Sequence, residues 1–330
     1  MAAVTFPFRV QPSATGIRPL DPLHDLPAVV ALIELGFRRE MDPQGQKMLA
    51  RLRRMARASP VERLILGAPN SPPGLVWVED EHVVGNLSLR RAAGSSNQGY
   101  LIGNVVVHPD YQGRGIGHAL MKAAIETTRR RKGHWIGLEV NANNEVARRL
   151  YERLGFRDAG YTEHLLRPAG LPWPDGPATQ VVWRKSSPKD GALWAALAGA
   201  IYRRFQARVL EVQRGRYSFG GWERQLTLWS SRQRESAWLQ AAETPRLAVR
   251  IHTDRRYRFH LWELLAHPLA GGRGSGEVVA RALAATRRAP SWPVISMIAA
   301  TESALLAVLQ ALGFRRHRTL LQMTLTRGEF

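Results

Sequence analysis

The sequence of 330 residues contains no cysteine, and this absence excludes disulfide bonds, thiolate metal sites and a cysteine nucleophile. It also lacks any apolar run of the roughly 18–20 residues that a membrane-spanning helix needs. The first 16 residues lack the basic and then apolar pattern of a signal peptide. The histidines show no metal-ligand spacing. We therefore expect a cytoplasmic protein without a metal that does not enter a membrane.

Lysine is scarce, although the chain is strongly basic. Only five of the 47 Lys and Arg residues are lysines, and 27 Asp and Glu residues leave a net charge of +20. Such a charge suggests nucleic-acid binding. The basic residues, however, occur in short scattered groups, such as Arg129–Lys132 and Arg315–Arg318, and do not form one arm. Attraction of phosphorylated small molecules explains the charge at least as well, so a nucleic-acid partner is the less favoured alternative.

Two blocks of sequence occur twice, in the same order and almost the same register. HPDYQGRGIG at 108–117 matches HPLAGGRGSG at 267–276 at six of ten positions, and LGFR at 154–157 recurs at 312–315. This agreement predicts a tandem duplication. We expect the seam within 184–191, a polar stretch with Pro and Gly, and the proline-rich 166–178 is the alternative boundary.

The order of strands and helices predicts the fold class. In the first half, strand-like segments such as 99–109 and 135–140 alternate with helical segments such as 117–131, which is typical of an α/β mixed sheet. Segment 179–184 is expected to be a closing strand of this half. The second half repeats the later part of the order but begins with 191–212, which is expected to be one long helix.

The segment VVVHPDYQGRGIGHAL at 105–120 runs from an apolar strand through a glycine-rich turn into a helix. Glycine permits positive φ and the close approach of a ligand. The free N–H groups of such a loop and of the first helical turn attract phosphate. The dinucleotide fingerprint and the P-loop pattern both fail here, so the loop alone indicates a phosphate site without naming its ligand.

The same segment closely resembles the pyrophosphate-binding motif of the GNAT superfamily of acetyl-CoA-dependent N-acetyltransferases. That motif, Gln/Arg-x-x-Gly-x-Gly/Ala, is matched by Gln112, Gly115 and Gly117, and 138–156 resembles the family's next motif. The resemblance covers most of 15–186 and extends weakly over 190–330. It implies two tandem GNAT-like domains, each a mixed, mostly antiparallel sheet flanked by helices. Residues 1–186 would be the catalytic domain with the acetyl-CoA site, and 187–330 a degenerate, non-catalytic one.

The resemblance also implies how acetyl-CoA, the co-substrate, would be held. Its pyrophosphate would sit on the loop, and its pantetheine arm would run beside the preceding strand. A backbone amide of Val106 or Val107 would contact the thioester oxygen. Asn144 would contact the pantetheine arm, with a helix N-cap as the alternative. The implied cofactor-binding residues are Val105, Val106, Val107, Gln112, Gly113, Arg114, Gly115, Ile116, Gly117 and Asn144.

Glu139 and Tyr151 are the implied catalytic residues. A phenol, with an ordinary pKa of about 10, can donate a proton to a departing thiolate of pKa about 8.5, so Tyr151 is the candidate acid. Strand alternation puts Glu139 opposite three apolar side chains. A carboxylate there resembles the branch that acetylates protein N-termini, and it could deprotonate the acceptor directly or through water. A tyrosine at the core margin and a solvated glutamate are the alternatives.

The second half has lost each of these side chains. Gln112 is replaced by Gly271, Glu139 by Met297, Asn144 by Glu302 and Tyr151 by Leu309, while glycines remain at 272, 274 and 276. Methionine and leucine cannot exchange protons. We therefore expect the second half to keep the fold without catalysis, and its ability to bind CoA stays open.

The leading prediction is an N-acetyltransferase that transfers acetyl from acetyl-CoA to a primary amine by direct attack. The acceptor would be a peptide N-terminus or a small-molecule amine. The alternatives are a non-catalytic acetyl-CoA-binding sensor or scaffold and, less favoured, a basic nucleic-acid-binding protein. Segments 34–48 and 161–184 are expected to select the acceptor, but they single out no particular amine. The sequence gives no sign of the oligomeric state.

Overall fold

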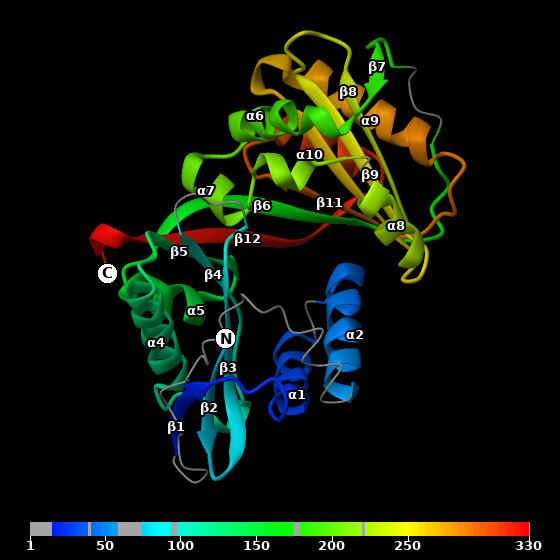
Figure 1. Cartoon of the computed structure of the whole chain (residues 1–330). Coiled ribbons are helices and arrows are strands. Elements are labelled where there is room, and N and C mark those ends of the chain that lie inside the picture. Colours follow the sequence, from blue (N-terminus) through cyan, green and yellow to red (C-terminus); the bar gives the residue numbers. More distant parts are fainter. Residues whose placement is uncertain are drawn as a thin grey trace, which may run out of the picture. The chain divides into compact units, whose positions relative to one another are not determined.

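The computed structural model of the protein describes residues 15–38, 41–58, 74–93, 98–174, 179–219 and 222–329. Positions 39–40 and 175–178, within the segments expected to select the acceptor, lie outside these ranges. The chain forms two compact units, one from Met1–Leu138 with Leu325–Phe330 and one from Glu139–Thr324, which can be followed by colour in Figure 1. The chain changes units within two strands, β5 (Trp135–Asn141) and β12 (Arg315–Thr326).

The first unit is built on a mixed sheet with the strand order β1-β2-β3-β4-β5. Neighbouring strands are antiparallel except for β4 and β5, which are parallel. Its elements, besides the first part of β5, are β1 (Gly16–Pro19), α1 (Leu26–Phe37), α2 (Pro43–Arg57), β2 (Leu75–Glu79), β3 (His82–Arg91), β4 (Gly99–Val107), η1 (Pro109–Tyr111), α4 (Ile116–Arg130) and η5 (Arg327–Glu329).

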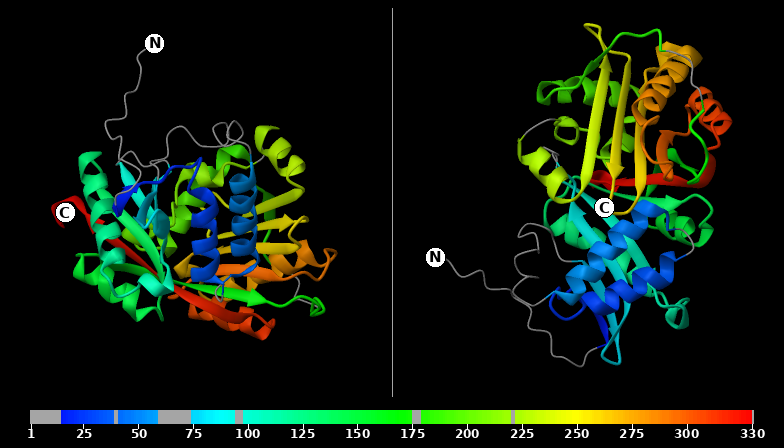
Figure 2. Two further views of the ribbon diagram at one scale, coloured as in Figure 1. Left: turned by 90° about the horizontal axis from the view of Figure 1, so that it is seen from below. Right: turned by 90° about the vertical axis from the view of Figure 1, so that its right-hand side faces the viewer.

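Helices cover both faces of this sheet (Figure 2). On one face, α1 and α2 pack against Val76 and Val78, which share that face because side chains alternate along β2. On the other face lies α4. Gly85 of β3 is so close to this helix that an added Cβ would lie 3.1 Å from the side chains of Ile116 and Leu120. This packing fixes the start of α4 just beyond the end of β4.

The second unit contains a larger mixed sheet with the order β12-β6-β11-β10-β9-β8-β7. Again a single pair among the described strands, β10 and β11, is parallel. Besides the later part of β5 and most of β12, its elements are α5 (Glu145–Arg153), β6 (Arg157–Arg167), β7 (Trp183–Lys185), η2 (Pro188–Asp190), α6 (Gly191–Ile201), α7 (Arg204–Val209), η3 (Arg214–Tyr217), α8 (Trp222–Ser230), β8 (Gln233–Gln240), β9 (Leu247–Asp254), β10 (Phe259–Ala266), η4 (Pro268–Ala270), α9 (Gly271–Thr286), β11 (Val294–Ala299) and α10 (Ser303–Ala311).

Two separate apolar clusters stabilise the second unit. On one face of the sheet, α9 and α10 pack against Trp262 of β10. On the other face, Trp194 of α6 and Tyr217 of η3 stack with ring centroids 5.4 Å apart and pack on Leu265 of β10. The helices on the two sides of β8–β10 are visible in the right-hand view of Figure 2. Burying large aromatic side chains removes much apolar surface from water, which is the main force that holds such layers together.

The predicted fold class is confirmed, since both sheets are mixed, mostly antiparallel and flanked by helices. Two local predictions are wrong. The expected helix over 191–212 is two helices, because the backbone is extended at Tyr202 and Arg203, with ψ of 139° and 151°. The expected closing strand of the first half, β7, pairs instead with β8, where Trp183 lies opposite Gln240. The predicted boundary at 186/187 falls inside the second unit and stays a prediction about the sequence repeat.

The second unit also takes one of its inner strands, β6, from the first half of the sequence. β6 pairs antiparallel with β11 on one edge and with β12 on the other. Thr162 of β6, for example, lies between Ala299 of β11 and Leu320 of β12. The two sequence halves therefore share one sheet within this unit.

Candidate active site

The predicted cofactor-binding residues belong to the first unit except for Asn144, and the predicted catalytic residues belong to the second. In the first unit, the parallel register of β4 with β5 ends at the pair Ile102–Leu138, whereas β4 continues to Val107. On its other edge, β4 remains paired with β3, where Val106 lies opposite Asn86. One edge of β4 beyond Ile102 is therefore outside the ladder, as required for a ligand that lies beside the strand.

A β-bulge lies where β4 leaves this ladder. Gly103 faces Ser88 of β3, but the next matched pair is Val106 with Asn86, so β4 has one extra residue. Asn104 takes a φ of +50°. The Asn86 side chain donates to the Asn104 carbonyl oxygen at 2.8 Å, and Asn104 Nδ2 donates to Ser88 Oγ at 3.2 Å. Bulges bend a strand and increase its twist. This bulge was not predicted from the sequence, although a Gly-Asn pair within a strand is a recognisable signal for it.

The glycine loop has the conformation that its sequence predicts. Gly113 and Gly115 have φ of +77° and +80°, where a side chain would strain the backbone, and α4 begins at Ile116. Within the described part of the chain, the backbone N–H groups from Gly113 to His118 have no hydrogen-bond acceptor. Unpaired N–H groups at a helix N-terminus form a binding site for an anion such as a phosphate.

Side chains on either side hold the loop in place. Gln112 Nε2 donates to the carbonyl oxygen of Val107 at 3.0 Å, which ties the loop back to the end of β4. The Arg114 guanidinium donates to Glu79 at 3.2 Å and to the Asp110 carbonyl oxygen at 3.0 Å. Arg114 is therefore engaged within the protein, and its predicted contact with the cofactor concerns its backbone N–H.

In the second unit, Glu139 lies on the exposed side of β5, as the alternation of the strand predicts. Its Oε1 accepts a hydrogen bond at 2.9 Å from Nε2 of Gln322, a fully buried residue of β12. Asn144 caps α5, because its Oδ1 accepts a hydrogen bond from the Ala147 N–H at 3.1 Å. The N-cap alternative is thus confirmed for this residue, and its contact with pantetheine stays a prediction.

Tyr151 lies on α5 with only 6% of its surface exposed. Its ring centroid is 6.1 Å from that of Phe156. Burial raises the pKa of its phenol to about 12, so the hydroxyl stays protonated throughout the physiological range. Within the described residues, this hydroxyl makes no hydrogen bond. A phenol that is protonated and has no protein acceptor is available to donate to a ligand.

The second copy of the glycine segment does not form a loop. The helix α9 begins at Gly271 and contains Gly272 and Gly274, whereas their counterparts Gly113 and Gly115 precede α4, which begins at Ile116. In α9, the N–H groups at the positions that match the first turn of α4 donate to carbonyl oxygens of α9 itself. They are therefore not available to bind an anion. The glycines that remain at 272, 274 and 276 in the second half therefore lie in a helix.

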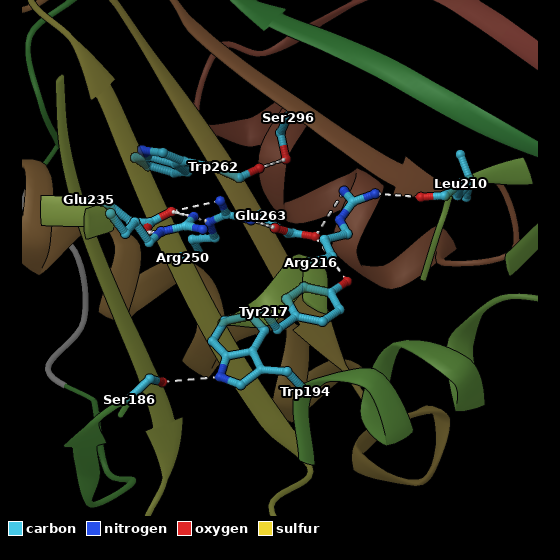
Figure 3. A network of polar contacts seen from close by, with 11 residues as sticks. Ser186, Trp194, Leu210, Arg216, Tyr217, Glu235, Arg250, Trp262, Glu263 and Ser296 are labelled. Carbon is cyan, nitrogen blue, oxygen red and sulfur yellow. Dashed lines mark hydrogen bonds and ion pairs between the residues drawn. The ribbon is translucent and has the colours of Figure 1, made fainter. Parts of the chain in front are cut away.

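The bulge is missing from the second copy as well. β10 pairs with β9 in an unbroken register from Phe259 to Ala266. Glu263 stands four residues before His267, as Asn104 does before His108. Figure 3 shows the Glu263 carboxylate between two guanidinium groups. It accepts from Arg216 at 3.2 Å, from Arg250 at 3.1 Å and from the Tyr217 hydroxyl at 3.2 Å. Both arginines lower the pKa of Glu263 against the opposing effect of burial.

The remaining counterparts of the predicted side chains also differ in environment. Leu309 is fully buried in the apolar cluster under α9 and α10, and Met297 lies on β11 opposite His164. Glu302 precedes α10 without capping it, and its Oε2 accepts from the Ala299 N–H at 3.3 Å. Burial raises the pKa of Glu302 to about 7. These groups do not reproduce the site that the first half predicts.

The described residues contain no group of three or more His, Asp or Glu side chains arranged to hold a metal ion. None of the helices in the described ranges has the length and apolar character needed to cross a membrane.

Comparisons with known proteins connect these features to a family. The Acetyltransferase (GNAT) family model matches residues 42–156, a range that contains every predicted cofactor-binding and catalytic residue. The [ribosomal protein bS18]-alanine N-acetyltransferase of Escherichia coli is 45% identical over 56 residues, which are 17% of this chain and 38% of the relative. The chain thus covers well under half of the length of that relative.

Solved structures resemble the chain over nearly its whole length. A tandem GNAT protein from the clavulanic acid biosynthesis pathway has a TM-score of 0.59 at 17% identity, over 95% of this chain and 98% of that one. A GCN5-related N-acetyltransferase from Sphaerobacter thermophilus also has a TM-score of 0.59, at 15% identity, over 94% and 95%. The fold is therefore that of a tandem GNAT protein. The family match at 42–156 agrees with this fold and shows that this part of the chain is similar to the GNAT acetyltransferases.

Proposed function

We propose that the protein transfers the acetyl group of acetyl-CoA to a primary amine. The observation that carries this proposal is the run of N–H groups from Gly113 to His118 without an acceptor in the described part of the chain. These groups suit the pyrophosphate of CoA, which carries negative charge to the positive end of the α4 dipole. The open edge of β4 beyond Ile102 offers backbone groups for the pantetheine amides.

The reaction is proposed to proceed by direct attack. Glu139 takes a proton from the acceptor ammonium, directly or through water, and the neutral nitrogen attacks the thioester carbonyl carbon. A backbone N–H of Val106 or Val107 stabilises the oxyanion. The C–S bond then breaks, and Tyr151 gives its proton to the departing thiolate. The nitrogen loses its second proton to solvent as the amide forms, Glu139 releases its proton, and Tyr151 regains one. The products are therefore the acetylated amine, CoA and one proton.

A peptide N-terminus is the first acceptor to test, because the Escherichia coli relative is named for acetylating an alanine of a ribosomal protein. A panel should compare a peptide that begins with alanine, its N-terminally blocked form and a set of small amines. CoA release can be followed with a thiol reagent, and since the chain has no cysteine, every thiol detected comes from CoA. Release with no amine in the panel, while acetyl-CoA still raises the melting temperature, would favour a sensor or scaffold.

Tyr151→Phe tests the assigned acid. The change removes one oxygen and keeps the ring that packs near Phe156, so the fold should persist. We expect kcat to fall about 100-fold, the lower end of what general acid–base catalysis contributes, with little change in the affinity for acetyl-CoA. Tyr161→Phe is the matched control, because that hydroxyl is bonded to Asp158 at 3.1 Å. Unchanged turnover in Tyr151→Phe would refute the role of this phenol.

A further inference from the structure

The carboxylate of Glu139 is held by an amide from the far end of the sequence. Gln322 Nε2 donates to Glu139 Oε1 and to Thr162 Oγ1, both at 2.9 Å, and Gln322 Oε1 accepts from Gln206 Nε2 at 3.0 Å. Both N–H groups of the amide and one lone pair of its oxygen are thus used. A flipped amide would put its oxygen against the carboxylate. The network therefore fixes the donor end of Gln322 toward Glu139.

A second layer holds Gln322 itself. Gln206 of α7 is 3% exposed and also donates to the carbonyl oxygen of Tyr161 at 3.0 Å. Gly160 of β6 makes room for it, because a Cβ at Gly160 would overlap the Gln206 amide. The row of amides is buried and satisfied, and such networks hold their members in one geometry.

We infer that Gln322 is a positioning residue for Glu139, supplied by the second half of the sequence to the catalytic base of the first. The inference rests on the proposed function. The Gln322 N–H stabilises the ionised carboxylate and restricts an exposed side chain to one orientation. A base must lie within hydrogen-bond reach of the proton that it removes. The second half would thus serve catalysis through Gln322 and Gln206, without an acetyl-CoA site of its own.

Gln322→Leu removes the donor while keeping a similar volume. We expect kcat to fall about tenfold, with the KM for acetyl-CoA unchanged. The acid limb of the kcat–pH profile should move up by about one pH unit, because the carboxylate would be protonated more easily without its donor. Measurements use the full-length protein with saturating acetyl-CoA and the best amine of the acceptor panel.

Tyr202, whose pKa responds to the charge of Glu139, and Glu302 are the two titratable groups that this test controls. Burial raises the pKa of Tyr202, and the charges of Glu302, Glu263 and Glu139 raise it further, so Tyr202 stays protonated. Glu302, with a pKa of about 7, titrates in the range of interest. The profiles are therefore also recorded in the Glu302→Gln background, where the shift caused by Gln322→Leu should persist.

Thr162→Val is the matched control, because it removes another partner of the same Gln322 amide and leaves the bond to Glu139. It should lower the melting temperature without moving the acid limb. In the Glu139→Gln background, Gln322→Leu should cause no further loss of kcat, since Gln322 acts through the carboxylate.

The outcomes separate the two proposals. Full kcat in Glu139→Gln would refute the assigned base, and the inference would fall with it. A low kcat in Glu139→Gln together with an unmoved acid limb in Gln322→Leu would refute the inference alone. If Gln322→Leu does not fold, Gln206→Met frees the Gln322 amide to rotate. Gln206→Met should move the acid limb of the kcat–pH profile up by less than Gln322→Leu does. If Gln206→Met folds and the acid limb does not move, the inference is overturned.

Discussion

The two copies of the glycine segment begin alike and then separate. In each copy, a histidine at a strand end caps a short 3₁₀ helix. The Asp110 N–H donates to His108 Nδ1 at 3.4 Å, and the Leu269 N–H donates to His267 Nδ1 at 3.1 Å. After this shared start, the first copy has two glycines with positive φ before α4, whereas in the second copy Gly271, with a φ of +57°, leads directly into α9.

Side chains outside the glycines account for the difference. Gln112 bonds back to β4, and Arg114 is held by Glu79 and by the backbone of η1. In the second copy, Gly271 has no side chain to make the first contact, and Arg273 donates instead to Gln180 Oε1 at 2.7 Å. Helix propagation is favourable once the first turn exists. Glycines thus permit a phosphate loop, but other contacts decide whether one forms.

The largest expected effect comes from alanine at equivalent glycines. Gly113→Ala places a side chain at φ +77°, which costs about 1–2 kcal/mol and turns the N–H groups away from a common anion. We expect acetyl-CoA affinity to fall about 100-fold, which is about 2.7 kcal/mol. Gly272→Ala, in a helical position whose nearest atom would be 3.9 Å away, should leave affinity unchanged. Isothermal titration calorimetry measures both.

The same titrations test whether the second half binds the co-substrate. One equivalent of acetyl-CoA should bind to the unchanged protein and to Gly272→Ala. Two equivalents, or one that persists at full affinity in Gly113→Ala, would show that α9 supports a site despite its missing loop.

Sequence patterns predicted the parts of the site that depend on local structure. The glycines and the helix start define the loop at 112–117, and period-two alternation placed Glu139 on the exposed side of β5. The glycines alone did not predict the structure of the second copy, because glycines also fit within a helix. The contact between Gln322 and Glu139 joins residues far apart in sequence, and the bulge at Asn104 depends on its partners in β3. The periodicity of a local sequence segment gives no information about contacts between distant segments.

Glu302 is the counterpart of Asn144 in the second half, but it does not cap its helix as Asn144 does. The ordinary pKa of a glutamate here is 4.5, and burial raises that of Glu302 to about 7. The folded state therefore binds the proton more tightly than the unfolded state, so stability is lost as pH rises from about 4.5 to about 7. The loss persists above that range. Because the Glu302 side chain is only half-buried, we expect this loss of folding stability to be about 2 kcal/mol.

Glu302→Asn should recover that stability at pH 8 and flatten the dependence of the melting temperature on pH. It also places at the start of α10 the residue that caps α5, and such a cap contributes about 1 kcal/mol. Thermal melts at pH 5 and pH 8 measure the change, with Glu145→Gln as an exposed control. An equal gain in melting temperature at pH 5 and pH 8 would show that the new helix cap causes the gain. It would contradict the raised pKa of Glu302.

The smallest expected effects are those of alanine substitutions in α9, which test why the second copy keeps its glycines. A Cβ at Gly274 would lie 2.5 Å from that of Ala270 and 3.1 Å from Leu247 Cδ2, so this glycine allows α9 to pack close to the sheet. Gly276 has open space around it. Gly276→Ala should therefore stabilise the helix by about 0.5–1 kcal/mol, whereas Gly274→Ala should destabilise it by about 1–3 kcal/mol through overpacking. Opposite shifts in melting temperature, with acetyl-CoA affinity unchanged in both variants, would show that packing maintains Gly274. A loss of acetyl-CoA affinity in either variant would instead indicate that these glycines take part in ligand binding.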